Sequence, residues 1–155
     1  MEWGSPCSGL FVKSLRLPSL PPPLKVAAFD MDSTLVVPKD PKAKFATSRT
    51  DWLWWNDAVP RRLKELHQQG YLVIVLSNQS GVGKGTTKIS DITGKITDMS
   101  EELGFELAAM IACNKDRNRK PCVGMWKHLV GAIDAVNMQD SWYAILDCEN
   151  ANSPF

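Results

Sequence analysis

Short apolar segments alternate with segments of helical periodicity along most of the chain. Continuous apolar runs predict four buried strands, at residues 25–30, 71–78, 105–113 and 141–146. Between them, apolar side chains recur every three or four residues, which predicts amphipathic helices over residues 57–70, 89–104 and 123–133. Strands that alternate with helices of this length are typical of a parallel sheet covered on both faces. We therefore expect a three-layer α/β/α domain of the Rossmann-like kind.

The predicted helices have recognisable ends. Asp57 can cap the first helix, and Gly70 ends it. Gly104 likewise ends the second helix. These signals set the boundaries that the periodicity alone leaves open.

The N-terminal part of the chain has no long periodic pattern. It contains the stretch LPSLPPPL, with three consecutive prolines, and predicts a flexible Pro-rich leader over residues 1–24. The domain is then expected over residues 25–155. Lys13 and Arg16 are basic and only Glu2 is acidic, but the hydroxyl-rich amphipathic character of a transit peptide is weak.

Composition narrows the class of protein. The chain has 155 residues, of which 44% are hydrophobic, and this suits one domain with a sizeable core. Its net charge of +1 gives no overall basic field for nucleic acid, although a local patch can still exist. No apolar run approaches the roughly 20 residues of a membrane span. Reduced thiols are expected, because no CxxC or zinc-like spacing occurs among Cys7, Cys113, Cys122 and Cys148.

The stretch VIVLSNQSGVGKGTTK, at residues 73–88, has the general appearance of a nucleotide-binding loop. A P-loop requires Gly-Lys followed by Ser or Thr, whose hydroxyl holds Mg²⁺. Here Gly85 follows Lys84, and Asn78 stands where the first glycine of the motif belongs. The spacing therefore argues against ATP or GTP binding, and no ATP-dependent kinase activity is expected.

Functional groups in sheets of this kind collect just beyond the carboxyl ends of the strands. In this chain the rule selects a small set of positions: Asp30, Asp32, Ser77, Asn78, the segment after Cys113, and Asp147. The set follows from the predicted topology alone.

Asp30 and Asp32 lie two residues apart where the first strand ends. Two close carboxylates repel each other unless a cation lies between them, and Mg²⁺ prefers such oxygen ligands. One carboxylate could attack phosphorus to form an aspartyl-phosphate, while the other transfers the proton of the leaving group. The alternative is a pair of solvated aspartates in a turn with Ser33 and Thr34.

The later strand ends carry groups that suit phosphate. The Ser77 hydroxyl can donate a hydrogen bond to a phosphoryl oxygen. The segment NKDRNRKP supplies Arg117, Arg119 and Lys120, and a lysine here could neutralise both phosphate and a nucleophilic aspartate. A basic run is more often a solvated loop, but chance alone would seldom place all of these groups at strand ends in this order.

The motifs FDMDSTL, SNQ and RKP resemble the first three motifs of the haloacid dehalogenase superfamily of phosphohydrolases. Longer stretches resemble the 3′-phosphatase domain of polynucleotide kinase/phosphatase: KVAAFDMDSTLV, DWLWWNDAVPRRLKEL, GYLVIVLSNQSGVGKG and RKPCVGMWKHL. The resemblance covers roughly Lys25 to Tyr143. It implies a capless haloacid dehalogenase fold and a Mg²⁺-dependent enzyme that removes 3′-phosphates from DNA ends in single-strand break repair.

The resemblance also implies a role for each matching residue. Asp30 would be the nucleophile and a Mg²⁺ ligand. Asp32 would be the general acid and base, with its backbone carbonyl on the metal. Ser77, Asn78 and Lys120 would hold the transferred phosphate.

Contacts to the DNA backbone are expected from Lys84, Arg117, Arg119 and the polar excursion between Val36 and Asp51, on charge alone. The resemblance implies DNA 3′-phosphate ends as substrate and DNA-repair scaffold proteins as partners. It further implies a nuclear location, with a mitochondrial one left open.

Two positions depart from the pattern of the family that the sequence resembles. Ser33 replaces the usual glycine after the second aspartate. The aspartate that completes the Mg²⁺ shell is expected at Leu146, whereas Asp147 comes one residue late. A one-residue slip along a strand turns a side chain to the opposite face. Asp147 and Glu149 are both candidates for the third metal-binding carboxylate.

The broken fourth motif leaves alternatives open. We expect a domain that is C-terminally incomplete near this motif, so a catalytically impaired, truncated isoform is one alternative. Another is a small-molecule phosphatase of the histidinol-phosphate or heptose-bisphosphate type, whose glycine loop also reads Asn-Gln-Ser-Gly. Those enzymes usually carry a Cys/His zinc loop, which this sequence lacks.

Overall fold

The computed structural model describes residues 3–13, 24–133 and 136–144 of the chain. Its main sheet has six strands in the spatial order β1-β2-β7-β6-β3-β8. In chain order these strands are β1 (Trp3–Cys7), β2 (Leu10–Lys13), β3 (Lys25–Phe29), β6 (Tyr71–Asn78), β7 (Ala108–Ala112) and β8 (Trp142–Ala144). A second sheet pairs two short strands, β4 (Val36–Val37) and β5 (Leu53–Trp54). The helices are α1 (Ala58–Gln68), α2 (Ser80–Gly83), α3 (Ile89–Leu103) and α4 (Gly124–Ala132).

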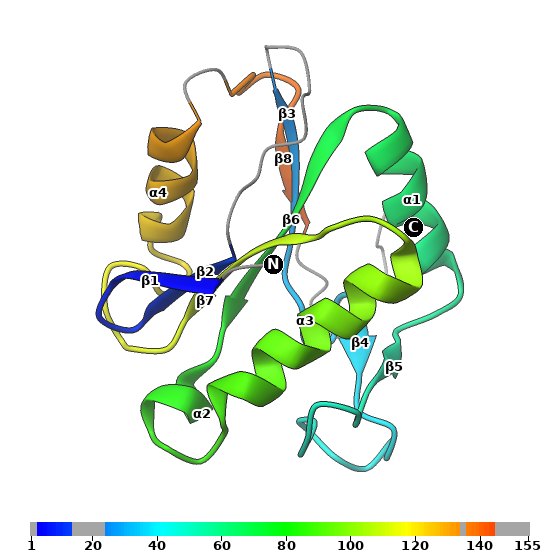
Figure 1. Cartoon of the computed structure of the whole chain (residues 1–155), viewed down its shortest axis with the longest axis vertical. Helices are drawn as coiled ribbons and strands as arrows, with labels where there is room; N and C mark the ends of the chain where they lie inside the picture. The colour runs from blue at the N-terminus through cyan, green and yellow to red at the C-terminus, as the bar shows by residue number, and fades with distance from the viewer. Residues whose placement is uncertain (1–2, 14–23, 134–135, 145–155) are drawn as a thin grey trace.

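Helices cover both faces of the main sheet (Figure 1). On one face, side chains of α1 and α3 form a core with alternate residues of the strands, among them Ala27, Phe29 and Val75. On the other face, α4 packs over the intervening residues, such as Ala28 and Ile74. The expected α/β fold with both sheet faces buried is therefore confirmed. None of the helices in the described ranges has the length and apolar content needed to cross a membrane.

The central strands β7, β6, β3 and β8 run parallel to one another. In their register Phe29 of β3 lies beside Val75 of β6, and Ser77 lies beside Ile111 of β7. The ends of these strands consequently meet at one edge of the sheet, which is where the functional groups were expected.

Most predicted elements occur with small changes in their ends. Helix α3 has the predicted bounds, and Gly104 follows it in a left-handed conformation with φ +77°. The predicted cap of α1 is wrong: the Asp57 side chain makes no cap hydrogen bond. Instead, Asn56 Oδ1 accepts hydrogen bonds from the backbone N–H groups of Ala58 (2.9 Å) and Val59 (3.2 Å). An amide oxygen satisfies the exposed donors of the first turn as well as a carboxylate does.

The predicted leader is wrong for residues 3–13, which form a β-hairpin. Strand β2 pairs with β1 and also with β7, in both cases antiparallel, so the sheet is mixed rather than wholly parallel. Leu10 is only 1% exposed and belongs to the core beneath α4. These strands are short and their partner β7 is distant in sequence, which explains why periodicity did not reveal them. Residues 14–23 lie outside the described residues.

Lys13 fixes the end of this hairpin to helix α3. Its side chain is fully buried, and Nζ donates a hydrogen bond to Ser100 Oγ at 3.1 Å. Burial lowers the pKa of the Lys13 ammonium, while the charge of Glu106 opposes this shift. The hairpin is therefore attached both to the sheet and to a helix.

The cysteines of the described residues agree with the expectation of reduced thiols. Cys7, Cys113 and Cys122 are free. Cys148 lies outside the described residues.

Shortening Leu10 tests whether the hairpin belongs to the core. We expect Leu10→Ala to lower the free energy of unfolding by about 2–4 kcal/mol, because it leaves a cavity beneath α4. Urea denaturation measures the change. Leu53→Ala is the matched control: Leu53 is 52% exposed, so its loss should cost less than about 1 kcal/mol. Equally small effects of both substitutions would show that the N-terminal segment is not packed.

Candidate functional site

A tight turn after β3 presents the two predicted carboxylates. Met31 is fully buried, whereas Asp30 and Asp32 on either side of it are partly exposed at the sheet edge. The backbone N–H groups of Leu35 and Val36 both donate to the Met31 carbonyl, at 2.9 and 3.1 Å. These bonds hold the chain in the turn and keep both aspartates at the end of the strand.

The third residue of this turn, Ser33, adopts a conformation that favours glycine. Its φ is +60°, in the left-handed region, and its N–H donates to the Val36 carbonyl at 2.8 Å. Glycine adopts this conformation without steric cost, which explains why the family that the sequence resembles usually has glycine at the position of Ser33.

Lys120 connects the ends of two parallel strands. Its Nζ donates one hydrogen bond to Asp30 Oδ1 and another to the Leu76 carbonyl, each at 2.6 Å. Asp30 follows β3 and Leu76 lies near the end of β6, so one ammonium group joins the predicted nucleophile to the neighbouring strand.

The Asn78 side chain holds the backbone of Lys120 from both sides. Its Nδ2 donates to the Lys120 carbonyl at 3.1 Å, and its Oδ1 accepts from the Lys120 N–H at 3.0 Å. The structure thus gives Asn78 the role of positioning Lys120. A direct contact of Asn78 with phosphate stays a prediction.

Gln79 links the other two predicted site residues, and the sequence reasoning missed it. Its Nε2 donates to Asp32 Oδ2 at 2.6 Å and to Ser77 Oγ at 2.9 Å. The signal was its place directly after Ser77 and Asn78 in the SNQ motif. Four predicted residues, Asp30, Asp32, Ser77 and Lys120, are therefore brought to the same strand ends.

The two carboxylates have different surroundings. Burial raises the pKa of the Asp32 carboxyl, while the Lys95 charge and the Gln79 hydrogen bond oppose this shift. A raised pKa suits a group that must hold a proton before donating it. At Lys120, burial lowers the pKa of the ammonium, and the charge of Asp30 opposes this.

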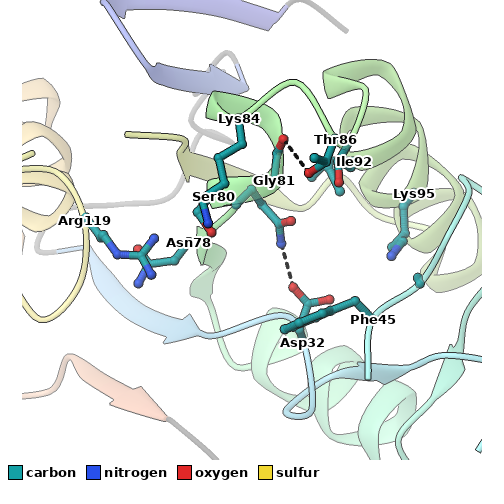
Figure 2. A pocket seen from close by; sticks show the side chains of 13 residues that line it. Asp32, Phe45, Asn78, Ser80, Gly81, Lys84, Thr86, Ile92, Lys95 and Arg119 are labelled. Carbon is teal, nitrogen blue, oxygen red and sulfur yellow. Dashed lines mark hydrogen bonds between the residues drawn. The ribbon is translucent and has the colours of Figure 1, made fainter. Parts of the chain in front are cut away.

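A cavity of about 410 Å³ opens beside Asp32 (Figure 2). Its basic lining residues are Lys84 from the glycine loop, Lys95 from α3, and Arg119 from the loop after β7. Phe45 and Ala46, from the excursion between β4 and β5, also line it. Two of the three basic residues predicted to contact DNA, Lys84 and Arg119, are thus at this cavity, together with part of the excursion.

The third predicted DNA contact lies elsewhere. Arg117 lines a different cavity together with Cys7 and Cys122. The structure therefore does not bring Arg117 together with Lys84 and Arg119. Asp147 and Glu149 lie outside the described residues.

Lys95 is a second residue that the sequence reasoning missed. It is only 2% exposed and lies on the apolar face of α3, one residue before the buried Ile96. Burial lowers the pKa of its ammonium, and the charges of Asp32, Asp51 and Asp91 oppose this. The available signal was a cation on the buried stripe of an amphipathic helix.

The glycine loop after β6 forms a tight turn. Residues Ser80–Gly83 form the short helix α2, and Gly85 has φ +73°, a conformation that L-residues rarely adopt. The loop places Lys84 on the cavity wall with an exposed side chain.

Asp30 and Asp32 supply hard oxygen donors, which are the ligands that Mg²⁺ prefers. Within residues 3–13, 24–133 and 136–144, no group of three or more His, Cys, Asp or Glu side chains could hold a metal. The described part of the site therefore fits Mg²⁺ with two aspartates, and a third carboxylate would have to come from residues beyond it.

Comparison with known families gives one match over most of the chain. The model of the family described as polynucleotide kinase 3 phosphatase matches residues 25–148. The match starts at β3 and includes the predicted site residues from Asp30 to Asp147, but not the alternative metal ligand Glu149.

Among curated proteins, an uncharacterised 20.8 kDa protein of Autographa californica nuclear polyhedrosis virus is 34% identical over 119 residues, or 77% of this chain. The bifunctional polynucleotide phosphatase/kinase of Schizosaccharomyces pombe is 35% identical over 110 residues, or 71% of this chain. The chain spans 64% of the viral protein and 27% of the yeast protein.

Solved structures agree on the fold. A haloacid dehalogenase-like phosphatase from Mesorhizobium loti superposes with a TM-score of 0.76 at 18% identity, over 92% of this chain and 72% of that one. The heptose 1,7-bisphosphate phosphatase of B. bronchiseptica, complexed with magnesium and phosphate, has a TM-score of 0.59 at 22% identity. That match covers 72% of this chain and 64% of the other. At these identities the likeness concerns the fold alone.

The ion pair between Asp30 and Lys120 predicts a change in titration. Asp30→Asn removes the carboxylate whose charge raises the pKa of the buried ammonium, so we expect the pKa of Lys120 to fall below its wild-type value. Lysine side-chain NMR over a pH series measures the change. Asp40→Asn, in the exposed excursion, should leave the Lys120 titration unchanged. An unchanged or raised pKa in Asp30→Asn would contradict the pairing.

The left-handed conformation of Ser33 predicts a stabilising substitution. Ser33→Gly removes the steric cost of this conformation and should raise the free energy of unfolding by about 0.5–1 kcal/mol. Thermal and urea unfolding measure it. Ser48→Gly serves as the control, because Ser48 is exposed and has no positive φ. A loss of stability in Ser33→Gly would be evidence against the strained turn.

Proposed function

This chain belongs to the polynucleotide kinase 3 phosphatase family, and we propose that it removes the terminal phosphate from 3′-phosphorylated DNA ends. One observation supports this most directly: Lys120 pairs with Asp30 while Asp32, two residues away, is held separately by Gln79. The arrangement suits a nucleophile beside a cation and an acid beside the leaving group.

In the first step an oxygen of Asp30 attacks phosphorus, and the bond between phosphorus and the 3′ oxygen breaks. The 3′ oxygen takes the proton of the Asp32 carboxyl, so the DNA leaves with a 3′-hydroxyl. Lys120 and the Ser77 hydroxyl hold the phosphoryl oxygens and offset their charge. The product of this step is an aspartyl-phosphate on Asp30.

In the second step a water molecule attacks the same phosphorus and gives its proton to Asp32. The bond between phosphorus and Asp30 breaks, which frees Asp30 and inorganic phosphate. Asp32 ends the cycle protonated, ready to act as an acid again. The raised pKa of the Asp32 carboxyl supports its alternation between the protonated and the ionised form.

Mg²⁺ is the cofactor in this proposal. Asp30, the Asp32 backbone carbonyl and Asp147 would hold it. When bound there, it would offset the negative charge of aspartate facing phosphate. DNA 3′-end repair, repair scaffold proteins and a nuclear location stay predictions that rest on the family.

A substrate panel tests the proposal. We expect phosphate release from an oligonucleotide with a 3′-phosphate in the presence of Mg²⁺. Release from the 5′-phosphorylated isomer and from histidinol phosphate should be much lower. EDTA should abolish the release, and Asp30→Asn should lower kcat by about 10³-fold or more because the nucleophile is lost.

Asp57→Asn is the matched control, since it removes the same charge from an exposed position that does not line the cavity and should keep wild-type activity. Turnover of histidinol phosphate alone would overturn the proposal in favour of a small-molecule phosphatase. No turnover by a chain whose circular dichroism shows an intact fold would indicate a catalytically impaired form.

A further inference from the structure

The cavity lies on the Asp32 side of the site and not on the side of Asp30 and Lys120. Asp32 lines it, together with Asn78 and Gln79, whereas the lining does not include Asp30 or Lys120. The general acid must lie next to the oxygen that leaves, and the attacking and leaving oxygens are roughly in line through phosphorus. If Asp30 is the nucleophile, the body of the substrate therefore extends from phosphorus past Asp32 into this cavity.

Three cations line the cavity, against one carboxylate. Lys84, Lys95 and Arg119 come from three different parts of the chain, and Asp32 is the one acidic side chain among the described lining residues. Figure 2 shows Arg119 and Lys95 at opposite sides of the space, with Asp32 between them. The lining thus suits an anion next to the acid rather than an apolar group.

Lys95 is buried, which is unusual for a lysine that lines a cavity. It is 2% exposed, and burial disfavours its charge. The acidic groups that face it, Asp32, Asp51 and Asp91, come from three separate elements. These carboxylates favour the charged form of Lys95, so its ammonium is held as a cation on the cavity wall, where a bound phosphodiester can pair with it.

Arg119 gives an independent indication of a ligand. Its Nη1 is buried and has no hydrogen-bond partner within the part of the chain that the structure describes. Buried donors are nearly always paired, so an acceptor oxygen is expected at this position. Guanidinium groups are especially suited to phosphate oxygens.

The wall opposite the glycine loop is held in place. Arg49 Nε donates to Asp98 Oδ2 at 2.8 Å, which ties the excursion to α3. Asp51 accepts hydrogen bonds from the N–H groups of Lys39 (3.1 Å) and Thr47 (2.8 Å) within the excursion. These contacts fix the segment that carries Phe45 and Ala46, so the cavity is a built feature of the fold.

We propose that this cavity binds the internucleotide phosphate closest to the 3′ end of the substrate, with Lys95 as its main contact and Lys84 and Arg119 beside it. The proposal rests on the proposed function and deepens it. It makes the enzyme selective for polynucleotides, because a nucleoside 3′-monophosphate has no internucleotide phosphate.

Two matched substrates test this site. The first is a thymidine dinucleotide with a 3′-phosphate, and the second is its analogue with a neutral methylphosphonate in place of the internucleotide phosphate. We expect the wild-type chain to prefer the charged dinucleotide in kcat/KM by about ten-fold or more. Lys95→Met should bring this ratio close to one, and Lys84→Met should reduce it by about three-fold.

Lys64→Met is the control, because it removes an exposed lysine from α1, away from the cavity, and should keep the wild-type ratio. If Lys95→Met does not fold, as judged by thermal unfolding, the exposed Lys84 carries the test. A wild-type ratio near one, or an unchanged ratio in the folded variants, overturns the proposal. If neither dinucleotide is hydrolysed, the proposed function fails and this site fails with it.

Discussion

The ammonium group of Lys120 holds the site together. It donates to Asp30 at the end of β3 and to the Leu76 carbonyl in β6, both at 2.6 Å, in a largely buried position. Electrostatic interactions are stronger there than in water, because the surroundings are less polarisable. The cation also offsets the charge of two aspartates that lie two residues apart. Without it, the repulsion between these carboxylates would oppose the turn that presents them.

The same contact shows how the fold separates two similar residues. Asp30 pairs with Lys120, which enters from the loop after β7. Asp32 instead accepts a hydrogen bond from Gln79, and the charge of Lys95 on α3 favours its ionised form. Two carboxyl groups in one short turn thereby acquire different partners, and burial raises the pKa of the Asp32 carboxyl. Such a difference in surroundings is what a division of nucleophile and acid between two carboxyl groups requires. The parallel strands of the sheet bring Lys120 and Gln79 to one edge, and a covering helix supplies Lys95.

Sequence reasoning was reliable where a strong periodic pattern or a topological rule applied. Helix α3 was predicted with its bounds, because its apolar stripe is long and Gly104 follows it. The meeting of Asp30, Ser77 and Lys120 followed from the rule that parallel strands end at one edge. The hairpin at residues 3–13 was missed, since a pairing between β2 and β7 leaves no local pattern. Gln79 and Lys95 were missed because their roles depend on which groups face them in three dimensions.

Substrate choice in this fold is decided away from the groups that perform the chemistry. The heptose-bisphosphate phosphatase and this chain share a fold at 22% identity, and a fold by itself does not determine which phosphomonoester is bound. In the proposed mechanism, Asp30, Ser77 and Lys120 face the phosphoryl group, which is the same in every phosphomonoester. In the same proposal, the part of a substrate that differs lies beyond the leaving oxygen, on the side of Asp32. Discrimination therefore has to come from α3, the glycine loop and the excursion between β4 and β5, which line the cavity on that side.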